Sequence, residues 1–113
     1  MHELGVVIEV VKTLDKIVLE NNLTEVESIV LQIGEISSMI PKYIEDCFDV
    51  AIDGTQFEQT KLRIEVLRAT ALCRVCDKVF SLVENEGKCE FCKSDDWELL
   101  SGKEFLIKEI IAC

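Results

Sequence analysis

Basic residues and proline are scarce in this chain of 113 residues. Its 12 Lys and Arg residues stand against 22 Asp and Glu residues, and the formal net charge of -10 repels nucleic-acid phosphates and anionic membranes. With one Pro and five Gly, no segment has the composition of a disordered chain, and the hydrophobic fraction of 49% suffices for a packed core. We therefore expect a folded acidic protein whose partners are cations and basic protein surfaces, with no nucleic acid and no membrane among them.

Histidine occurs once, at position 2, which disfavours an enzyme. No nucleophile, base and orienting group can be named together elsewhere in the chain. An export signal is also missing, because the N-terminus has no basic segment and Glu9 and Lys12 interrupt the apolar residues that follow. We expect a non-enzymatic protein in the reducing environment of the cytoplasm.

Cysteine, by contrast, is plentiful, and four of the six cysteines form two Cys-x-x-Cys pairs separated by twelve residues: Cys73 with Cys76, and Cys89 with Cys92. Two such turns direct four thiolates to one point, as in a closed tetrahedral zinc site. Disulfides would suit an exported miniprotein, and a thioredoxin-type pair would occur singly. Rubredoxin-type iron is a closer rival, but the Gly and Pro residues typical of rubredoxin loops are missing. The pattern favours structural Zn²⁺ in a zinc ribbon.

The residues around the two pairs suggest how this module is completed. Phe80, Phe91 and Trp97 are expected to cap its small core, whereas a role in stacking on bases is disfavoured by the net acidic charge of residues 71–100. Four thiolates around Zn²⁺ leave two negative charges, and nearby basic residues either offset them or are simply solvated. These basic residues are Arg74, Lys78, Lys88 and Lys93.

Two segments carry apolar residues three and four positions apart, the period of an amphipathic helix. One covers about residues 3–21, and the other begins at Pro41 and ends at Asp53-Gly54, with Cys47 on its apolar side. The apolar arc of the first helix is wider than one sheet needs to cover. It is therefore either deeply buried or in contact with another chain, and a homodimer stays open.

Alternating apolar residues predict strands at 26–33, 61–69 and 105–112, and a short strand at 97–100. In the first strand, Ile29, Leu31 and Ile33 should face the core. The strands that enter and leave the cysteine module, 61–69 and 105–112, are expected to be antiparallel neighbours.

The order of elements predicts an α+β fold, in which two helices pack on a small three-stranded mixed sheet and the four-cysteine zinc-ribbon module is inserted between the second and third strands. We expect two domains. Residues 1–70 and 103–113 form an α/β domain that carries the N-terminus, and residues 71–102 form the zinc-binding domain.

The N-terminus is a second candidate metal site. Met1 should be retained because the residue after it is as large as His, so a free amine lies one peptide bond from the His2 imidazole. The amine, the backbone and ring nitrogens of His2 and the carboxylate of Glu3 can converge on one ion, and such nitrogen-rich sets suit Ni(II) or Cu(II). A frayed terminal residue is the ordinary alternative, and chemistry alone leaves both open.

The combination of these features resembles the HypA/HybF family of nickel metallochaperones for [NiFe]-hydrogenase maturation. The resemblance covers the whole chain and rests on Met1-His2-Glu3, on Ile33-Gly34-Glu35-Ile36-Ser37-Ser38, on the paired Cys-x-x-Cys motifs and on the final strand. It implies that Ni²⁺ is cargo bound through His2, and the donors named above add the Met1 amine and Glu3 to the expected nickel site. It also implies that Zn²⁺ is structural, held by Cys73, Cys76, Cys89 and Cys92.

The resemblance further implies two partners: a nickel-handling maturation GTPase and the [NiFe]-hydrogenase large subunit that receives the metal, with urease as a recipient in some members. One position departs from the family pattern. Some members have an acidic nickel ligand directly after the stretch matching Ser37-Ser38-Met39, where this chain has Ile40. Glu3 or water would have to replace that oxygen. The alternative function is a zinc-ribbon module that binds protein or nucleic acid and has no nickel role.

Overall fold

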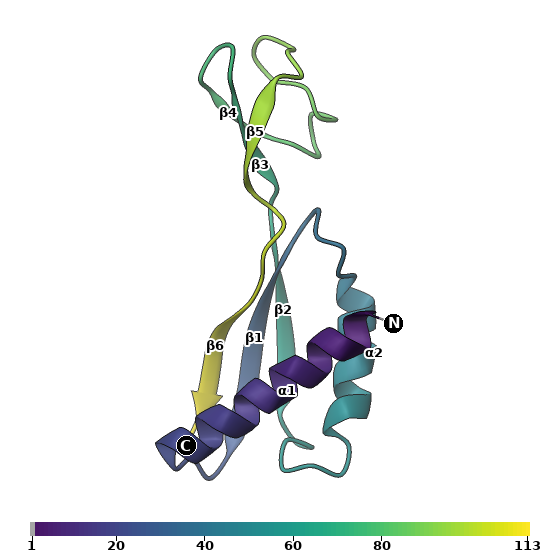
Figure 1. Ribbon diagram of the computed structural model, residues 1–113, viewed down its shortest axis with the longest axis vertical. Coiled ribbons are helices and arrows are strands. Elements are labelled where there is room, and N and C mark those ends of the chain that lie inside the picture. The colour runs from purple at the N-terminus through teal and green to yellow at the C-terminus, as the bar shows by residue number, and fades with distance from the viewer. Residues whose placement is uncertain (1) are drawn as a thin grey trace. The chain divides into compact units, whose positions relative to one another are not determined.

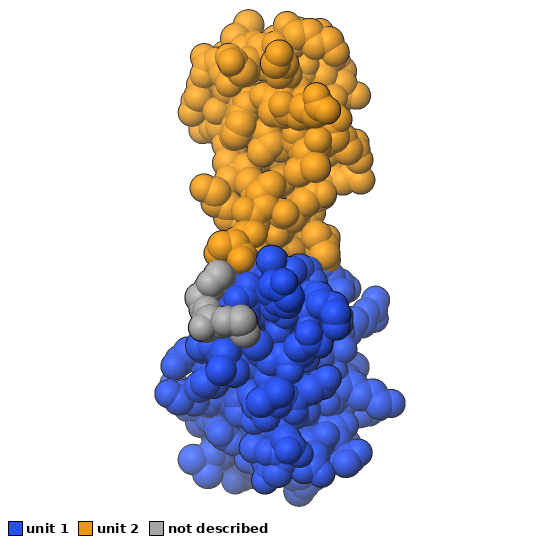
Figure 2. Space-filling view, turned by 90° about the vertical axis from the view of Figure 1, so that its right-hand side faces the viewer, with its two compact units in different colours: residues 1–32, 39–65, 106–113 blue, residues 33–38, 66–105 orange. Residues whose placement is uncertain are grey.

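The computed structural model describes the backbone of residues 2–113 and the side chains of residues 3–113. Within these described residues, two helices and six strands follow in the order α1 (His2–Asn21), β1 (Val26–Gly34), α2 (Pro41–Ile52), β2 (Lys61–Leu67), β3 (Thr70–Cys73), β4 (Val79–Ser81), β5 (Trp97–Ser101) and β6 (Phe105–Ala112) (Figure 1). The chain divides into two compact units (Figure 2). Unit 1 comprises residues 1–32, 39–65 and 106–113, and unit 2 comprises residues 33–38 and 66–105.

The predicted α+β architecture is confirmed. Helices α1 and α2 pack against one another and cover a mixed three-stranded sheet of order β2-β1-β6 (Figure 1). The predicted core face of β1 is also confirmed, because Ile29, Leu31 and Ile33 are each 0% exposed. Full burial of such a side chain contributes about 1.5–3 kcal/mol, so the central strand is the main anchor of this sheet.

Local sequence signals explain where the two helices begin and end. Pro41 occupies the first turn of α2, where its missing N–H and fixed φ are tolerated. Beyond the C-terminus of α1, Asn22 adopts φ 52, a left-handed conformation that stops a helix. Cys47 lies on the buried side of α2 at 7% exposure, as its place in the apolar pattern predicts.

The prediction that the strands on either side of the cysteine module are antiparallel neighbours is wrong for β2 and β6, because β1 lies between them. The end of β1 finds hydrogen-bond acceptors on both sides. The Gly34 N–H donates to the Glu104 carbonyl at 2.7 Å, and the Glu35 N–H donates to the Leu67 carbonyl at 2.8 Å. Two strands that enter and leave the module are antiparallel neighbours further along, where β3 pairs with β5.

Unit 2 contains a second three-stranded sheet, of order β4-β3-β5, and both neighbours of β3 are antiparallel to it. Strands β3 and β4 were not expected from the sequence as separate elements. The core of this unit is small and includes two of the four module cysteines. Its buried residues are Ala69, Ala71, Cys73, Phe80, Leu82 and Cys89, and the partly buried residues packed against them are Ile36, Cys76, Trp97 and Leu99.

Two of the three aromatic residues that were expected to cap the module do so, since Phe80 is buried and Trp97 packs against the core. The expectation is wrong for Phe91, which is 53% exposed. Phe91 lies inside the second Cys-x-x-Cys pair, and Val75, at 64% exposure, has the equivalent position in the first. A turn that directs both sulfurs inward leaves the side chain between them on the outside.

No helix within residues 2–113 combines the length and the apolar content that crossing a bilayer requires.

Candidate metal centre

The two Cys-x-x-Cys turns have the same backbone geometry. The Asp77 N–H donates to the Cys73 carbonyl at 2.9 Å, and the Lys93 N–H donates to the Cys89 carbonyl at 3.0 Å. Both donors have left-handed backbones, with φ 58 at Asp77 and φ 65 at Lys93. Residues other than Gly adopt this conformation at a cost of about 1–2 kcal/mol, so the sequence, which has no Gly at these positions, predicts the turns but not their left-handed residues.

One further backbone hydrogen bond closes each turn, from the N–H of its first cysteine to a carbonyl five residues later. The N–H of Cys73 donates to the Lys78 carbonyl at 2.9 Å, and the N–H of Cys89 donates to the Ser94 carbonyl at 2.8 Å. Each pair of sulfurs is therefore oriented by its own closed backbone loop, which is the arrangement expected of a zinc-binding knuckle.

The four sulfurs lie within 4.8 Å of one another, and none of these cysteines forms a disulfide. The Sγ atoms of Cys73 and Cys92 are 3.5 Å apart, and those of Cys76 and Cys89 are 3.6 Å apart. Metal–sulfur bonds of about 2.3 Å place the sulfurs of a tetrahedral site about 3.8 Å apart. The donor set thus fits one tetrahedral metal ion with little rearrangement.

The thiols compete for ionisation in this cluster. Burial disfavours the thiolate of Cys89, but the N–H groups of Cys92 and Phe91 and the neighbouring thiols bring its pKa down to about 6. Desolvation raises the pKa of Cys76 to about 12, and hydrogen bonds with the other thiols add to this increase. One thiolate therefore forms readily, whereas a full set of four needs a cation at its centre.

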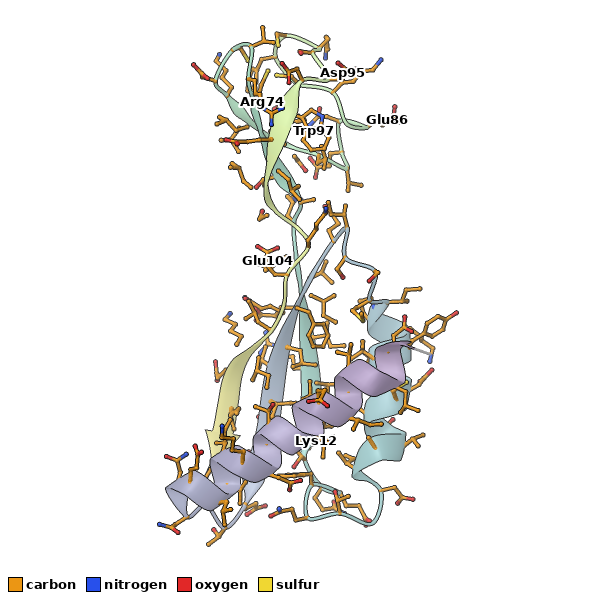
Figure 3. All side chains as sticks on the ribbon, viewed as in Figure 1. Lys12, Arg74, Glu86, Asp95, Trp97 and Glu104 are labelled. Atoms are coloured by element: carbon orange, nitrogen blue, oxygen red, sulfur yellow. The ribbon has the colours of Figure 1, made fainter. Side chains whose placement is uncertain are left out.

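The basic residues near the site mostly contact other groups. The Arg74 guanidinium donates to Asp96 Oδ1 and to the Trp97 carbonyl, both at 2.9 Å, and so ties the first Cys-x-x-Cys turn to β5 (Figure 3). Lys78 Nζ lies 4.5 Å from the centroid of the Phe91 ring. These contacts join the two turns to one another and to the sheet, and no periodic pattern in the sequence indicates them.

The structure describes only part of the candidate metal site that the sequence predicts at the N-terminus. Met1 and the side chain of His2 lie outside the described residues, and His2 is the first residue of α1. Glu3, in the first turn of α1, is only 4% exposed. Ile40 is the N-cap of α2, and its carbonyl accepts the N–H groups of Tyr43 and Ile44 at 3.0 Å. Its side chain has no oxygen with which to cap the helix or to bind an ion.

Comparison with known proteins covers this chain almost from end to end. The family model described as hydrogenase/urease nickel incorporation, metallochaperone, hypA matches residues 1–112. The hydrogenase maturation factor HypA of Trichodesmium erythraeum (strain IMS101) is 37% identical over 111 residues, covering 97% of this chain and 94% of the relative. The corresponding factor of Chlorobium limicola (strain DSM 245 / NBRC 103803 / 6330) is 30% identical over 110 residues, covering 97% and 95%.

Two solved structures share the fold. The solution structure of the Ni metallochaperone HypA from Helicobacter pylori matches with a TM-score of 0.68 at 22% identity, covering 97% of this chain and 96% of that one. A second HypA solution structure matches with a TM-score of 0.74 at 23% identity, covering 100% and 97%. From the family match over residues 1–112 and the relatives at 30% identity or more, we conclude that this chain belongs to the HypA family of nickel-incorporation metallochaperones, which are not enzymes.

Proposed function

We propose that this protein binds Ni(II) at its N-terminus and delivers it for the maturation of [NiFe] hydrogenase or, in the alternative use suggested by the family, of urease. The observation that carries this proposal is the match to the nickel-incorporation family over residues 1–112, a range that includes Met1-His2-Glu3. His2 supplies the only imidazole in the chain.

Delivery is proposed to occur by ligand exchange at an incomplete coordination shell. The N-terminal amine, the two nitrogens of His2 and the carboxylate of Glu3 supply the protein ligands, and water completes the shell because Ile40 supplies none. A water ligand leaves more easily than a protein ligand held by the chain. The acceptor's ligands would therefore enter at that position and then displace the protein ligands one at a time.

We propose that the four-cysteine site holds Zn²⁺ in a structural role. Four protein ligands leave no open position for a substrate. The core of unit 2 is small and includes Cys73 and Cys89 themselves, so metal binding and folding should be linked in the predicted zinc-binding domain, residues 71–102.

The proposed partners are a maturation GTPase that handles nickel and the large subunit of a [NiFe] hydrogenase. The acidic charge of the chain favours basic surfaces on both partners and raises the local concentration of cations near the N-terminus. We place the protein in the cytoplasm, where thiols stay reduced and free to bind metal.

Metal content and Ni(II) titration of untagged protein test this proposal, because any residue left before Met1 changes the amine. Wild-type protein should hold one zinc and bind one Ni(II), and His2→Ala should lose tight nickel binding while it retains zinc. Glu9→Ala, an exposed carboxylate on α1, is the matched control and should bind nickel as the wild type does. Nickel affinity that persists in His2→Ala would refute the proposed site and favour a zinc-ribbon interaction module.

A further inference from the structure

The segment 33–38, which is the end of β1 and the turn after it, is held by two stretches of unit 2, one just before β3 and one just after β5. Three consecutive N–H groups in the segment 33–38 donate to backbone carbonyls of these two stretches in alternation. The Gly34 and Ile36 N–H groups donate to the carbonyls of Glu104 and Gly102, at 2.7 Å and 2.9 Å, and the Glu35 N–H donates to the carbonyl of Leu67 at 2.8 Å. All six residues belong to unit 2.

The carboxylate of Glu35 adds a bond that neither sheet supplies. The Ala69 N–H lies in the break between β2 and β3 and donates to Glu35 Oε1 at 3.0 Å. Ala69 is 0% exposed, and its carbonyl accepts the N–H of Leu82 at 2.9 Å. Loss of the acceptor of a buried N–H is strongly destabilising, so the bond from Ala69 to Glu35 stabilises the break between β2 and β3.

Close packing reinforces these hydrogen bonds. A Cβ atom at Gly34 would lie 2.0 Å from the Gly102 carbonyl oxygen, and one at Gly102 would lie 2.6 Å from the Ala69 Cβ. Ile36 packs against the core cluster that contains Cys73 and Cys89. The segment 33–38 therefore contacts the same small core that two of the metal-binding cysteines complete.

We propose that Glu35 is a positioning residue that makes the segment 33–38 respond to the metal state of the four-cysteine site. With metal bound, Cys73 and Cys89 are fixed, the core around them is ordered, and the bond between Glu35 and Ala69 holds the segment closed. Without metal, the core loosens and the three N–H bonds of the segment open. This proposal requires a metal at the cysteines and is independent of nickel binding.

Amide hydrogen exchange of the full chain, loaded with zinc and after chelation, tests the proposal. Chelation should speed exchange at Gly34, Glu35 and Ile36 by at least about tenfold in the wild type, since loss of the acceptor bonds exposes these amides. Glu35→Ala should speed exchange at the same amides by about tenfold to a hundredfold with zinc still bound. The amides of β3 and β4 should keep their protection in that variant, because β3 pairs with β4 and β5 and not with Glu35.

Two further variants sharpen the result. Glu98→Ala removes an exposed carboxylate from β5 and should exchange like the wild type in both metal states. Glu35→Gln keeps a carbonyl acceptor and should increase the exchange rate at Gly34, Glu35 and Ile36 by at least about threefold, less than Glu35→Ala does. This variant tests the proposal if Glu35→Ala does not fold.

Three results would overturn the proposal. The first is unchanged exchange at Gly34, Glu35 and Ile36 in the Glu35 variants. The second is loss of protection throughout β3 and β4 in those variants with zinc bound, which would show general destabilisation instead of positioning. The third is a wild-type segment that exchanges equally with and without zinc.

Discussion

Replacing Gly34 by Ala should destabilise unit 2 severely, because the new methyl group has no room. The Cβ would lie 2.0 Å from the Gly102 oxygen, 2.2 Å from the Gly102 carbonyl carbon and 2.6 Å from the Lys103 nitrogen. All three are backbone atoms, so no side chain can rotate away. The backbone at Gly34 must therefore move away from the backbone at Gly102 and Lys103. Overpacking of this kind costs about 1–3 kcal/mol, and the two adjacent hydrogen bonds add about 1 kcal/mol each. We expect a loss of about 3–5 kcal/mol, a large part of the stability of a small domain.

Urea unfolding of the zinc-loaded protein measures this loss. Trp97 is the only tryptophan and lies in unit 2, where its Nε1 donates to the Gly87 carbonyl at 2.8 Å, so its fluorescence reports the unfolding of this unit. Gly5→Ala is the matched control, because a Cβ at Gly5 meets nothing within 4 Å. Followed by circular dichroism, it should be neutral or stabilising by up to about 1 kcal/mol. A loss below about 1 kcal/mol in Gly34→Ala would refute the reasoning about close packing.

Three other outcomes follow from the sites described. Cys76→Ser should abolish stoichiometric zinc binding measured by metal analysis, whereas Cys113→Ser, at the exposed C-terminus, should leave one zinc bound. Arg74→Ala removes the two 2.9 Å hydrogen bonds from the first Cys-x-x-Cys turn to Asp96 and Trp97 and should speed zinc transfer to a chelator by about tenfold. An unchanged transfer rate would show that the turn does not need these bonds. Hydrogen bonds, foremost from Lys108, hold the pKa of Glu65 below its ordinary 4.5. The resulting stability exists above pH 4.5 and is lost as pH falls through the lowered pKa, so Lys108→Ala should flatten the acid limb of the urea midpoint.

Periodic patterns were sufficient to predict the elements of unit 1. The apolar spacing of α1 and α2 and the alternation around Ile29 reflect burial on one side, which is a local property of the chain. The cysteine site was predictable for a different reason, because the spacing within each Cys-x-x-Cys pair already restricts where the two sulfurs point. Both kinds of signal lie within a few consecutive residues.

Features that depend on distant partners were not predictable in this way. The placement of β1 between β2 and β6 pairs β1 with strands that lie far along the chain, and the N–H groups of Gly34 and Glu35 likewise donate to the distant carbonyls of Glu104 and Leu67. Strands β3 and β4 are too short for their alternation to stand out. The exposure of Phe91 follows from the direction of a turn, which a hydrophobicity pattern does not contain.

The repeated geometry of the two cysteine turns has a consequence for how the site exchanges metal. Each turn has its own backbone bonds, from Cys73 to Lys78 and from Cys89 to Ser94, so each pair of sulfurs forms a separate bidentate chelator. A metal ion can therefore dissociate from one pair of sulfurs while the other pair still coordinates it. The released pair remains tethered by the short chain between the turns, at a high effective concentration, and recapture is fast. Slow metal loss from this site would thus arise from fast recapture by the released pair as well as from the affinity of the complete site.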